Sequence, residues 1–266
     1  MIRVGAQGWN YDAWVGPFYP SGTRAINYLG TYARAFDTVE VDSTFYAVPA
    51  IKTVRAWAAR TPEKFTFSLK LPQAITHERR MRESGDVLMQ FLDAARELGP
   101  KLGPILIQCG PDFGPGELPA LAGFLPLLPP DMHFAIEFRQ KGWINEGVIA
   151  LLREHRVALA LSDGKWIPRA TLLKLAEQPT SDIAYVRWMG PDRSIVDYSR
   201  IQVDRTKEIE VWSETLRSLM QRVTTAFCYV NNHFAGHSPA SIRMLQTKLG
   251  QASVDPAQLG DQLSMF

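Results

Sequence analysis

The chain has 266 residues, of which 46% are hydrophobic and 21% charged, and this ordinary globular composition suffices for one large core. A net charge of +2 permits an anionic partner without requiring one, and two cysteines without a CxxC spacing argue against a disulfide framework or a thiolate zinc site. No apolar run reaches the roughly 18 residues of a membrane span, and no leader-like segment follows Met1, so we expect a cytoplasmic protein without a membrane role.

Runs typical of strands alternate along the chain with runs typical of helices. The strand-like runs occupy residues 2–7, 38–42, 65–70, 105–108, 133–138, 158–161, 183–188 and 225–230. The helix-like runs that follow them occupy residues 25–35, 53–59, 86–98, 118–127, 145–154, 170–177, 206–221 and 240–249. This order predicts a single (β/α)8 TIM barrel over residues 1–250, followed by a short, extended and flexible tail over residues 251–266. A doubly wound open sheet is the alternative, but no G-x-G-x-x-G motif follows the first strand.

The second predicted strand, TVEVD, places two carboxylates in an element that should be buried. Val39 and Val41 share one face of this strand, while Glu40 and Asp42 share the other. Two further strands, FTFSLK and HFAIEFRQ, repeat this alternation of apolar and polar side chains. In a barrel, one face of each strand meets the helices and the other faces the interior. We therefore expect the apolar faces to pack on helices and the charged faces to point into the barrel.

The C-terminal ends of the predicted strands carry many polar side chains, and this rim forms the active site in TIM barrels. We predict a hydrolase- or lyase-type site with Glu40 and Glu137 as the acid/base pair, Lys70 as an electrophile or nucleophile, and Asp163 as a further catalytic carboxylate. The side chains expected to bind the substrate or its phosphate are Trp9, His77, Arg139, Arg187, Asn231, Asn232, His233, His237 and Ser238. The alternative is an internal network of ion pairs that only fills the barrel.

Two segments near this rim suggest contacts to phosphate. Ser238 and Pro239 fit the start of the last helix, where free N–H groups and the helix dipole attract anions, although they could simply begin a helix. The basic segment ITHERRMRES could contact phosphates, or it could be a solvated loop. Aromatic side chains in the same loops, including Trp166, would either stack on bases and sugars or seal the rim.

No local motif predicts a cofactor. His233 and His237 are four residues apart, but Gly236 and Pro239 argue that the two histidines do not share one helix. A divalent metal site would therefore have to form through space from Glu40, Glu137, Asp163 and the histidines.

Several motifs resemble, in the same order, those of the bacterial family called domain of unknown function 72. They are GAQGWNYDAWVGPFYP, VEVDSTFYAVP, FSLKLPQAITH, AIEFR, LSD, YVRWMG and NNHFAGHSPAS, and the resemblance runs from about residue 3 to residue 250. It implies a TIM barrel and supplies no activity. Family members usually carry Asn where this chain has Asp42 and His where it has Gln140, which weakens a strict role for Asp42. The barrel is also similar, in fold alone, to endonuclease IV-type DNA repair enzymes, whose histidine-rich metal cluster this sequence does not reproduce.

The last five residues, QLSMF, resemble the pentapeptide with which bacterial proteins bind the sliding clamp. The resemblance implies that Leu263, Met265 and Phe266 enter an apolar pocket of the clamp and that Gln262 fixes the register. The alternative is a tail whose apolar end folds back onto the barrel.

Three functions are compatible with these patterns. The first is a DNA-processing or repair enzyme recruited by the sliding clamp, which the tail and the basic segment favour. The second is an enzyme acting on a phosphorylated or sugar-like metabolite, expected to have a narrow barrel mouth and no affinity for DNA. The third is a non-catalytic adaptor tethered to the clamp, which would keep its function without the rim carboxylates.

Overall fold

Nine parallel strands form a single sheet in this computed structural model, which describes residues 1–260. Their order in the sheet is β6-β5-β4-β3-β2-β1-β9-β8-β7. The strands are β1 (Ile2–Gln7), β2 (Thr38–Val41), β3 (Thr66–Lys70), β4 (Leu102–Gln108), β5 (Phe134–Glu137), β6 (Ala158–Leu159), β7 (Leu161–Gly164), β8 (Ile183–Gly190) and β9 (Thr225–Val230). Every predicted strand is present, so the strand pattern of the sequence places the sheet correctly.

The sheet curves into a nearly closed barrel because its two edge strands, β6 and β7, follow each other directly in the chain. Only Ala160 separates β6 from β7; β6 pairs with β5, while β7 pairs with β8. The N–H of Ala160 itself donates to the carbonyl of Ile136 at 2.8 Å. The predicted sixth strand is therefore one barrel position divided into two short strands. The TIM-barrel prediction is confirmed, and the open doubly wound sheet is excluded.

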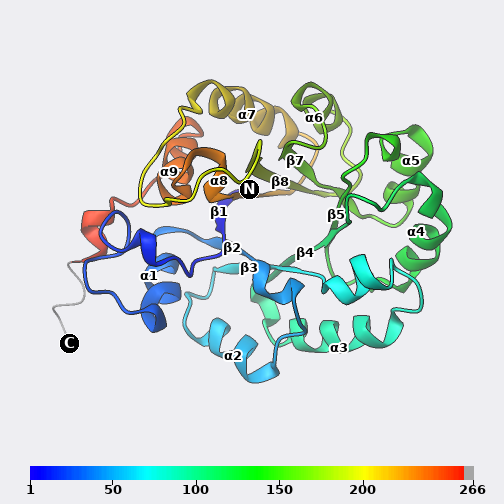
Figure 1. The fold of residues 1–266 in the computed structure, drawn as a ribbon, viewed down its shortest axis with the longest axis horizontal. Helices are drawn as coiled ribbons and strands as arrows, with labels where there is room; N and C mark the ends of the chain where they lie inside the picture. Colours follow the sequence, from blue (N-terminus) through cyan, green and yellow to red (C-terminus); the bar gives the residue numbers. More distant parts are fainter. Residues whose placement is uncertain (261–266) are drawn as a thin grey trace.

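The longer helices surround the barrel on its outer side, and the short α8 lies at its C-terminal rim (Figure 1). In the part of the chain that is described, they are α1 (Tyr28–Ala35), α2 (Ile51–Ala59), α3 (Gly85–Arg96), α4 (Leu118–Phe124), α5 (Glu146–Glu154), α6 (Arg169–Ala176), α7 (Thr206–Leu219), α8 (Asn232–Ala235) and α9 (Ser238–Lys248). The four-residue α8 was not predicted, because it is too short to show a helical period. Within residues 1–260, no helix is long and apolar enough to cross a membrane.

Strand β2 has one face toward the helices and one toward the barrel interior, as its alternating side chains predict. Val39 and Val41 belong to the apolar core that contains the helix residues, whereas the fully buried Glu40 reaches Arg187 and Tyr185 on β8 inside the barrel. A separate apolar cluster fills the N-terminal half of the interior with Leu106, Ala135, Ala158, Ala160, Ile183, Tyr185, Phe227 and Tyr229. The charged side chains therefore form a layer above this cluster, nearer the C-terminal rim.

Residues 251–260, the first part of the predicted tail, contact the barrel. The side chain of Gln251 donates to the carbonyl of Ile2 at 2.8 Å, and Leu259 is buried in the core. The guanidinium of Arg34 on α1 donates to the carbonyl of Gln258 at 3.3 Å. Whether the tail begins at residue 251 stays a prediction. The clamp-like Gln262, Leu263, Met265 and Phe266 lie outside the described residues.

Candidate functional site

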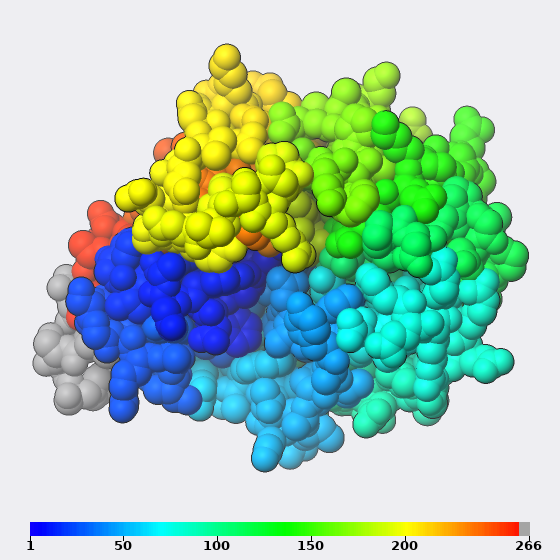
Figure 2. Space-filling model, in the orientation of Figure 1, coloured from blue at the N-terminus to red at the C-terminus, as the bar shows by residue number. Residues whose placement is uncertain are grey.

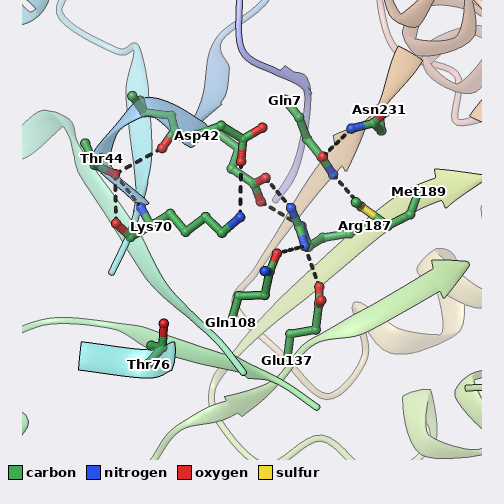
Figure 3. Close-up of polar contacts among 12 residues, drawn as sticks. Gln7, Asp42, Thr44, Lys70, Thr76, Gln108, Glu137, Arg187, Met189 and Asn231 are labelled. Carbon is green, nitrogen blue, oxygen red and sulfur yellow. Dashed lines mark hydrogen bonds and ion pairs between the residues drawn. The ribbon is translucent and has the colours of Figure 1, made fainter. Parts of the chain in front are cut away.

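A network of buried charges centres on Arg187, which β8 points into the barrel (Figure 3). Its Nε and Nη2 donate to the two carboxylate oxygens of Glu40 at 3.0 and 2.7 Å. Its Nη1 donates to Gln108 Oε1 at 3.2 Å and to Glu137 Oε2. Arg187 is 1% exposed, Glu40 0% and Glu137 2%. One guanidinium thus neutralises two carboxylates that come from β2 and β5.

The two carboxylates of this network have opposite pKa shifts. Burial raises the pKa of Glu40, and Arg187 offsets only part of that effect. Burial also acts to raise the pKa of Glu137, but Arg187, Arg139 and the Ser162 hydroxyl, which donates at 2.6 Å, together lower it to about 2. Glu137 is therefore ionised at neutral pH, while Glu40 is the more easily protonated member. Such a divergence is typical of sites that hold and transfer protons.

Lys70 and Asp42 lie beside this network at the ends of β3 and β2. Lys70 Nζ is 3.6 Å from Asp42 Oδ1 and 4.4 Å from the centre of the Phe45 ring. Burial lowers the pKa of Lys70; Asp42 opposes this shift and Arg187 reinforces it. The main chain of Lys70 is fixed by Thr44, whose hydroxyl accepts from the Lys70 N–H at 3.0 Å.

A cavity of about 440 Å³ opens at the C-terminal rim beside the network. Its walls come from the ends of β5, β7, β8 and β9 and from the following loops, and Figure 2 shows the segment after β8 (yellow) on the face in view. Glu137 and Arg139 lie on one wall, with Lys165 and Arg193 contributing two further cations. Arg139 lies 5.5 Å and Lys165 4.4 Å from the ring of Trp166. This volume lies within the range of small-molecule sites, about 300–1,000 Å³.

Comparison with known proteins places this site within a family. The sequence profile described as "Protein of unknown function DUF72" matches residues 3–262. The chain belongs to this family. Its sequence is 26% identical to the UPF0759 protein YunF of Bacillus subtilis over 258 residues, which cover 89% of this chain and 90% of YunF. It is also 34% identical to the UPF0759 protein YecE of Escherichia coli over 147 residues, covering 55% of this chain and about half, 52%, of YecE.

Two solved structures of the DUF72 family share the fold. A protein from Thermotoga maritima superposes with a TM-score of 0.80 at 22% identity, covering 94% of this chain and all of the other. A protein from Enterococcus faecalis superposes with a TM-score of 0.77 at 22% identity, covering 96% of this chain and 97% of the other. At this identity the likeness establishes the barrel and its topology. The chemistry of the site is therefore argued from its own residues.

Five of the predicted site residues line the cavity: Glu137, Arg139, Asn231, Asn232 and His233. The amide of Asn231 donates to Gln7 Oε1 at 2.8 Å, and His233 Nε2 lies 3.2 Å from the hydroxyl of Tyr198. Asn232 Nδ2 is buried and has no hydrogen-bond partner among residues 1–260. Burial, reinforced by Arg193, lowers the pKa of His233, so its ring is neutral at pH 7.

Asp163 lies outside the barrel interior, contrary to the predicted placement beside the other carboxylates. Its Oδ2 accepts from Arg169 Nε at 2.6 Å and from Trp212 Nε1 at 2.7 Å. The neighbouring Ser162 faces the interior instead and bonds Glu137. Plain alternation from the interior-facing Ala160 places Ser162 inside and Asp163 outside, and the prediction did not follow it along this segment.

Trp9 also lies away from the cavity. Its ring packs edge-on against Trp57 at 5.8 Å and Phe67 at 6.4 Å, between the barrel and α2. The aromatic residues that line the cavity are Tyr11, Trp166 and Tyr198. Rim aromatics were expected either to pack within the protein or to stack on a ligand. Trp9 packs within the protein, whereas Trp166 lines the cavity, where a ligand could contact it.

The start of α9, predicted to bind an anion, is buried by the chain itself. The helix begins at Ser238 with His237 as its N-cap, one residue earlier than predicted. The N–H of Ser238 donates to Asn232 Oδ1 at 3.0 Å, and His237 Nδ1 lies 2.8 Å from the carbonyl of Tyr198. Both side chains are buried, so this helix start supports the loops around the cavity.

The predicted basic loop is matched by acidic partners. Arg80 pairs with Asp112 and, at 2.7 Å, with Glu117, which Arg82 also contacts. His77, on the preceding turn, is half-buried and lies 2.8 Å from the Thr76 hydroxyl. Burial and the nearby Arg139 lower the pKa of His77. These ion pairs reduce the positive charge that the loop offers to a nucleic acid.

Several residues of the cavity wall were not in the predicted site: Tyr11, Ser162, Lys165, Trp166, Arg193 and Tyr198. Arg193 and Tyr198 lie between β8 and α7, where residues 191–205 form neither helix nor strand. A loop of this length is uncommon inside a compact domain and commonly functional, which is the signal that the sequence offered. Within the described part of the chain, no group of three or more His, Cys, Asp or Glu side chains could hold a metal ion.

Proposed function

We propose that this protein is an enzyme of hydrolase or lyase type that acts on a small phosphate-bearing or sugar-like metabolite. The observation that carries the proposal is the pairing of a buried, ionised Glu137 with Arg139 on the wall of a 440 Å³ cavity that also contains Trp166. A cavity of this size accepts a small ligand, and the ring of Trp166 offers an apolar surface beside two cations.

The cations on the cavity wall support an anionic ligand. Arg139 uses its Nε to contact Glu137 at 3.3 Å, and its terminal nitrogens donate to no residue within 1–260. Lys165 and Arg193 are exposed at the same cavity. Arg187 is less suited to this role than predicted, because its charge is already matched by Glu40 and Glu137. We therefore assign the phosphate to Arg139, with Lys165 and Arg193 at the mouth.

Proton transfer in this proposal is assigned to His233 and Glu40, and Glu137 has another role. A carboxyl with a pKa of about 2 is a weak base, so Glu137 serves mainly to hold and orient the ligand. His233 is neutral and lines the cavity, where it can accept a proton from a bound ligand. Burial raises the pKa of Glu40, which contacts Arg187, so Glu40 is the carboxyl group that can hold and donate a proton.

Binding of glycerol 3-phosphate, with glycerol as the uncharged match, tests the proposed ligand class. Isothermal titration should detect glycerol 3-phosphate and not glycerol, and Arg139→Ala should weaken binding about tenfold or more, as expected for a lost charge-assisted contact. Lys174→Ala on α6, which does not line the cavity, is the matched control. Absence of binding, or equal binding by the Arg139→Ala variant, would overturn the proposal.

A DNA-processing role is the second candidate, and the exposed Lys165 and Arg193 beside Trp166 favour it. Such a cluster could hold a backbone phosphate while the ring stacks on a base. Fluorescence polarisation should then show DNA binding that weakens steeply with salt and that Arg193→Ala reduces. Salt-independent or absent binding at low ionic strength would leave the metabolite as the substrate.

Recruitment by the sliding clamp belongs to this second candidate and rests on the terminal QLSMF. A labelled peptide of residues 251–266 should bind a bacterial clamp with micromolar affinity and lose that affinity on Phe266→Ala. If the unmodified peptide does not bind at high clamp concentration, the main sequence argument for DNA is gone.

A further inference from the structure

Lys70 is a buried amine that the proton-transfer chemistry above does not use. It is the last residue of β3, it is 7% exposed, and Figure 3 shows its side chain extending toward Arg187. Its main chain is held at both polar groups, because Thr44 accepts from its N–H at 3.0 Å and donates to its carbonyl at 2.8 Å. The backbone from which the Lys70 side chain starts is therefore fixed at the rim.

The surroundings of Lys70 Nζ differ from those of a lysine with a structural role. Lys101 Nζ donates to the carbonyls of Ala58 and Thr61 at 2.6 and 2.7 Å. Lys70 Nζ donates no hydrogen bond to any residue from 1 to 260, and its nearest carboxylate oxygen, on Asp42, is 3.6 Å away. Its side chain nevertheless keeps 9% of its surface exposed, so its burial at the rim is incomplete.

Four charged groups face Lys70, and they come from the β2, β5 and β8 segments. Asp42, Glu40 and Glu137 are negative, and Arg187 is positive. Burial lowers the pKa of the amine and the carboxylates only partly restore it, so a larger fraction of Lys70 is neutral at pH 7 than of an exposed lysine. A neutral amine is a nucleophile, whereas an ammonium group is not.

We propose that Lys70 forms an imine with the carbonyl carbon of an aldehyde or ketone that carries a phosphate or another anion. The inference rests on the proposed function, because it places the anion at Arg139 and the carbonyl at Lys70. It narrows the substrate to a phosphorylated carbonyl compound and selects the nucleophilic role among those predicted for Lys70.

The reaction balances with the groups present. The lone pair of Nζ attacks the carbonyl carbon, the C=O π pair moves to oxygen, and that oxygen takes a proton to give a carbinolamine. Nζ releases a proton, for which the carboxylate of Asp42 at 3.6 Å is the nearest acceptor. The hydroxyl then leaves as water after receiving a proton, and the C=N bond forms. One amine and one carbonyl thus give one imine and one water, without an oxidant or a reductant.

Reductive trapping with glycolaldehyde phosphate tests this inference. The whole protein is treated with limiting glycolaldehyde phosphate and sodium cyanoborohydride at pH 7.5, and labelled lysines are located by peptide mass spectrometry. We expect Lys70 to be labelled about tenfold faster than the exposed Lys174 or the bonded Lys101, in line with a larger neutral fraction. Lys70→Arg keeps the charge and should remove the label without changing the others.

Glycolaldehyde, which lacks the phosphate, separates failure of this inference from failure of the proposed function. Equal labelling of Lys70 by both aldehydes supports the nucleophile and overturns the anion site. An unlabelled Lys70 in a protein that binds glycerol 3-phosphate overturns the imine and leaves the proposed function intact. Preferential labelling of Lys165, the lysine of the cavity mouth, also overturns the inference.

Discussion

Removing Arg187 should destabilise the barrel more than removing any surface arginine. Arg187→Met leaves Glu40 and Glu137 without their shared counter-ion in a layer where both are at most 2% exposed. Loss of one partner from a buried ion pair costs about 3–5 kcal/mol, and here two carboxylates lose the same partner, so we expect about 5 kcal/mol at pH 7. At a rate of roughly 2–4 °C per kcal/mol, the melting temperature should fall by roughly 10–20 °C.

Urea unfolding followed by circular dichroism, compared at pH 5 and pH 8, measures this loss. The loss should be smaller at pH 5, because Glu40, whose pKa burial already raises, takes up a proton once Arg187 is absent. Arg55→Met, which removes an exposed contact to Glu97, is the matched control and should change stability far less. A loss below about 1 kcal/mol, or one independent of pH, would refute the view that these charges are desolvated and mutually dependent.

Three further predictions concern single side chains of the same barrel. Glu137→Gln should make the free energy of unfolding depend less on pH between 4.5 and 2. The native carboxylate has a pKa of about 2 against an ordinary 4.5, so it stabilises the fold above pH 4.5 and loses this effect as the pH falls toward 2. Urea unfolding with the same pH dependence as the unmodified protein would contradict this prediction. Asp163→Asn should cost about 1–3 kcal/mol in thermal unfolding by weakening the bond from Trp212, while binding of glycerol 3-phosphate persists. Gly190→Ala should unfold at lower urea, because its φ is +77° and a Cβ would lie 2.1 Å from the carbonyl oxygen of His233; a Gly123→Ala control, where a Cβ would meet nothing, should not.

The barrel was predictable from the sequence because strand-like and helix-like runs alternate along the chain and three of the strands show the period of two. Even the interior position of Glu40 followed from the alternation in TVEVD. The division of the sixth strand at Ala160 was not predictable, since nothing in its apolar run marks a change of pairing partner. This division leaves the alternation unchanged: Ala160 and Ser162 both face the interior, so the outer position of Asp163 was open to prediction. Arg169 and Trp212 bind Asp163 there.

The candidate site was predictable only where it depends on strand ends. Glu137 and Arg139 follow directly from the β5 pattern, and they line the cavity. Arg193 and Tyr198 come from a loop without regular structure, whose path is set by tertiary contacts and not by a local period. The ion pairs of the basic loop were also out of reach, because Arg80 finds Asp112 and Glu117 more than 30 residues away along the chain.

The apolar cluster in the N-terminal half of the barrel separates the charged layer from solvent on that side. Leu106, Tyr185, Phe227 and Tyr229 close the interior below Glu40 and Arg187, and each of them is at most 7% exposed. Among residues 1–260, this packing makes the C-terminal rim, where the cavity opens, the side from which water and a ligand reach the charged layer. A substrate seated there would cover this side. While it is bound, the buried carboxylates and Lys70 would be shielded from bulk solvent and would exchange protons mainly with the substrate and with one another.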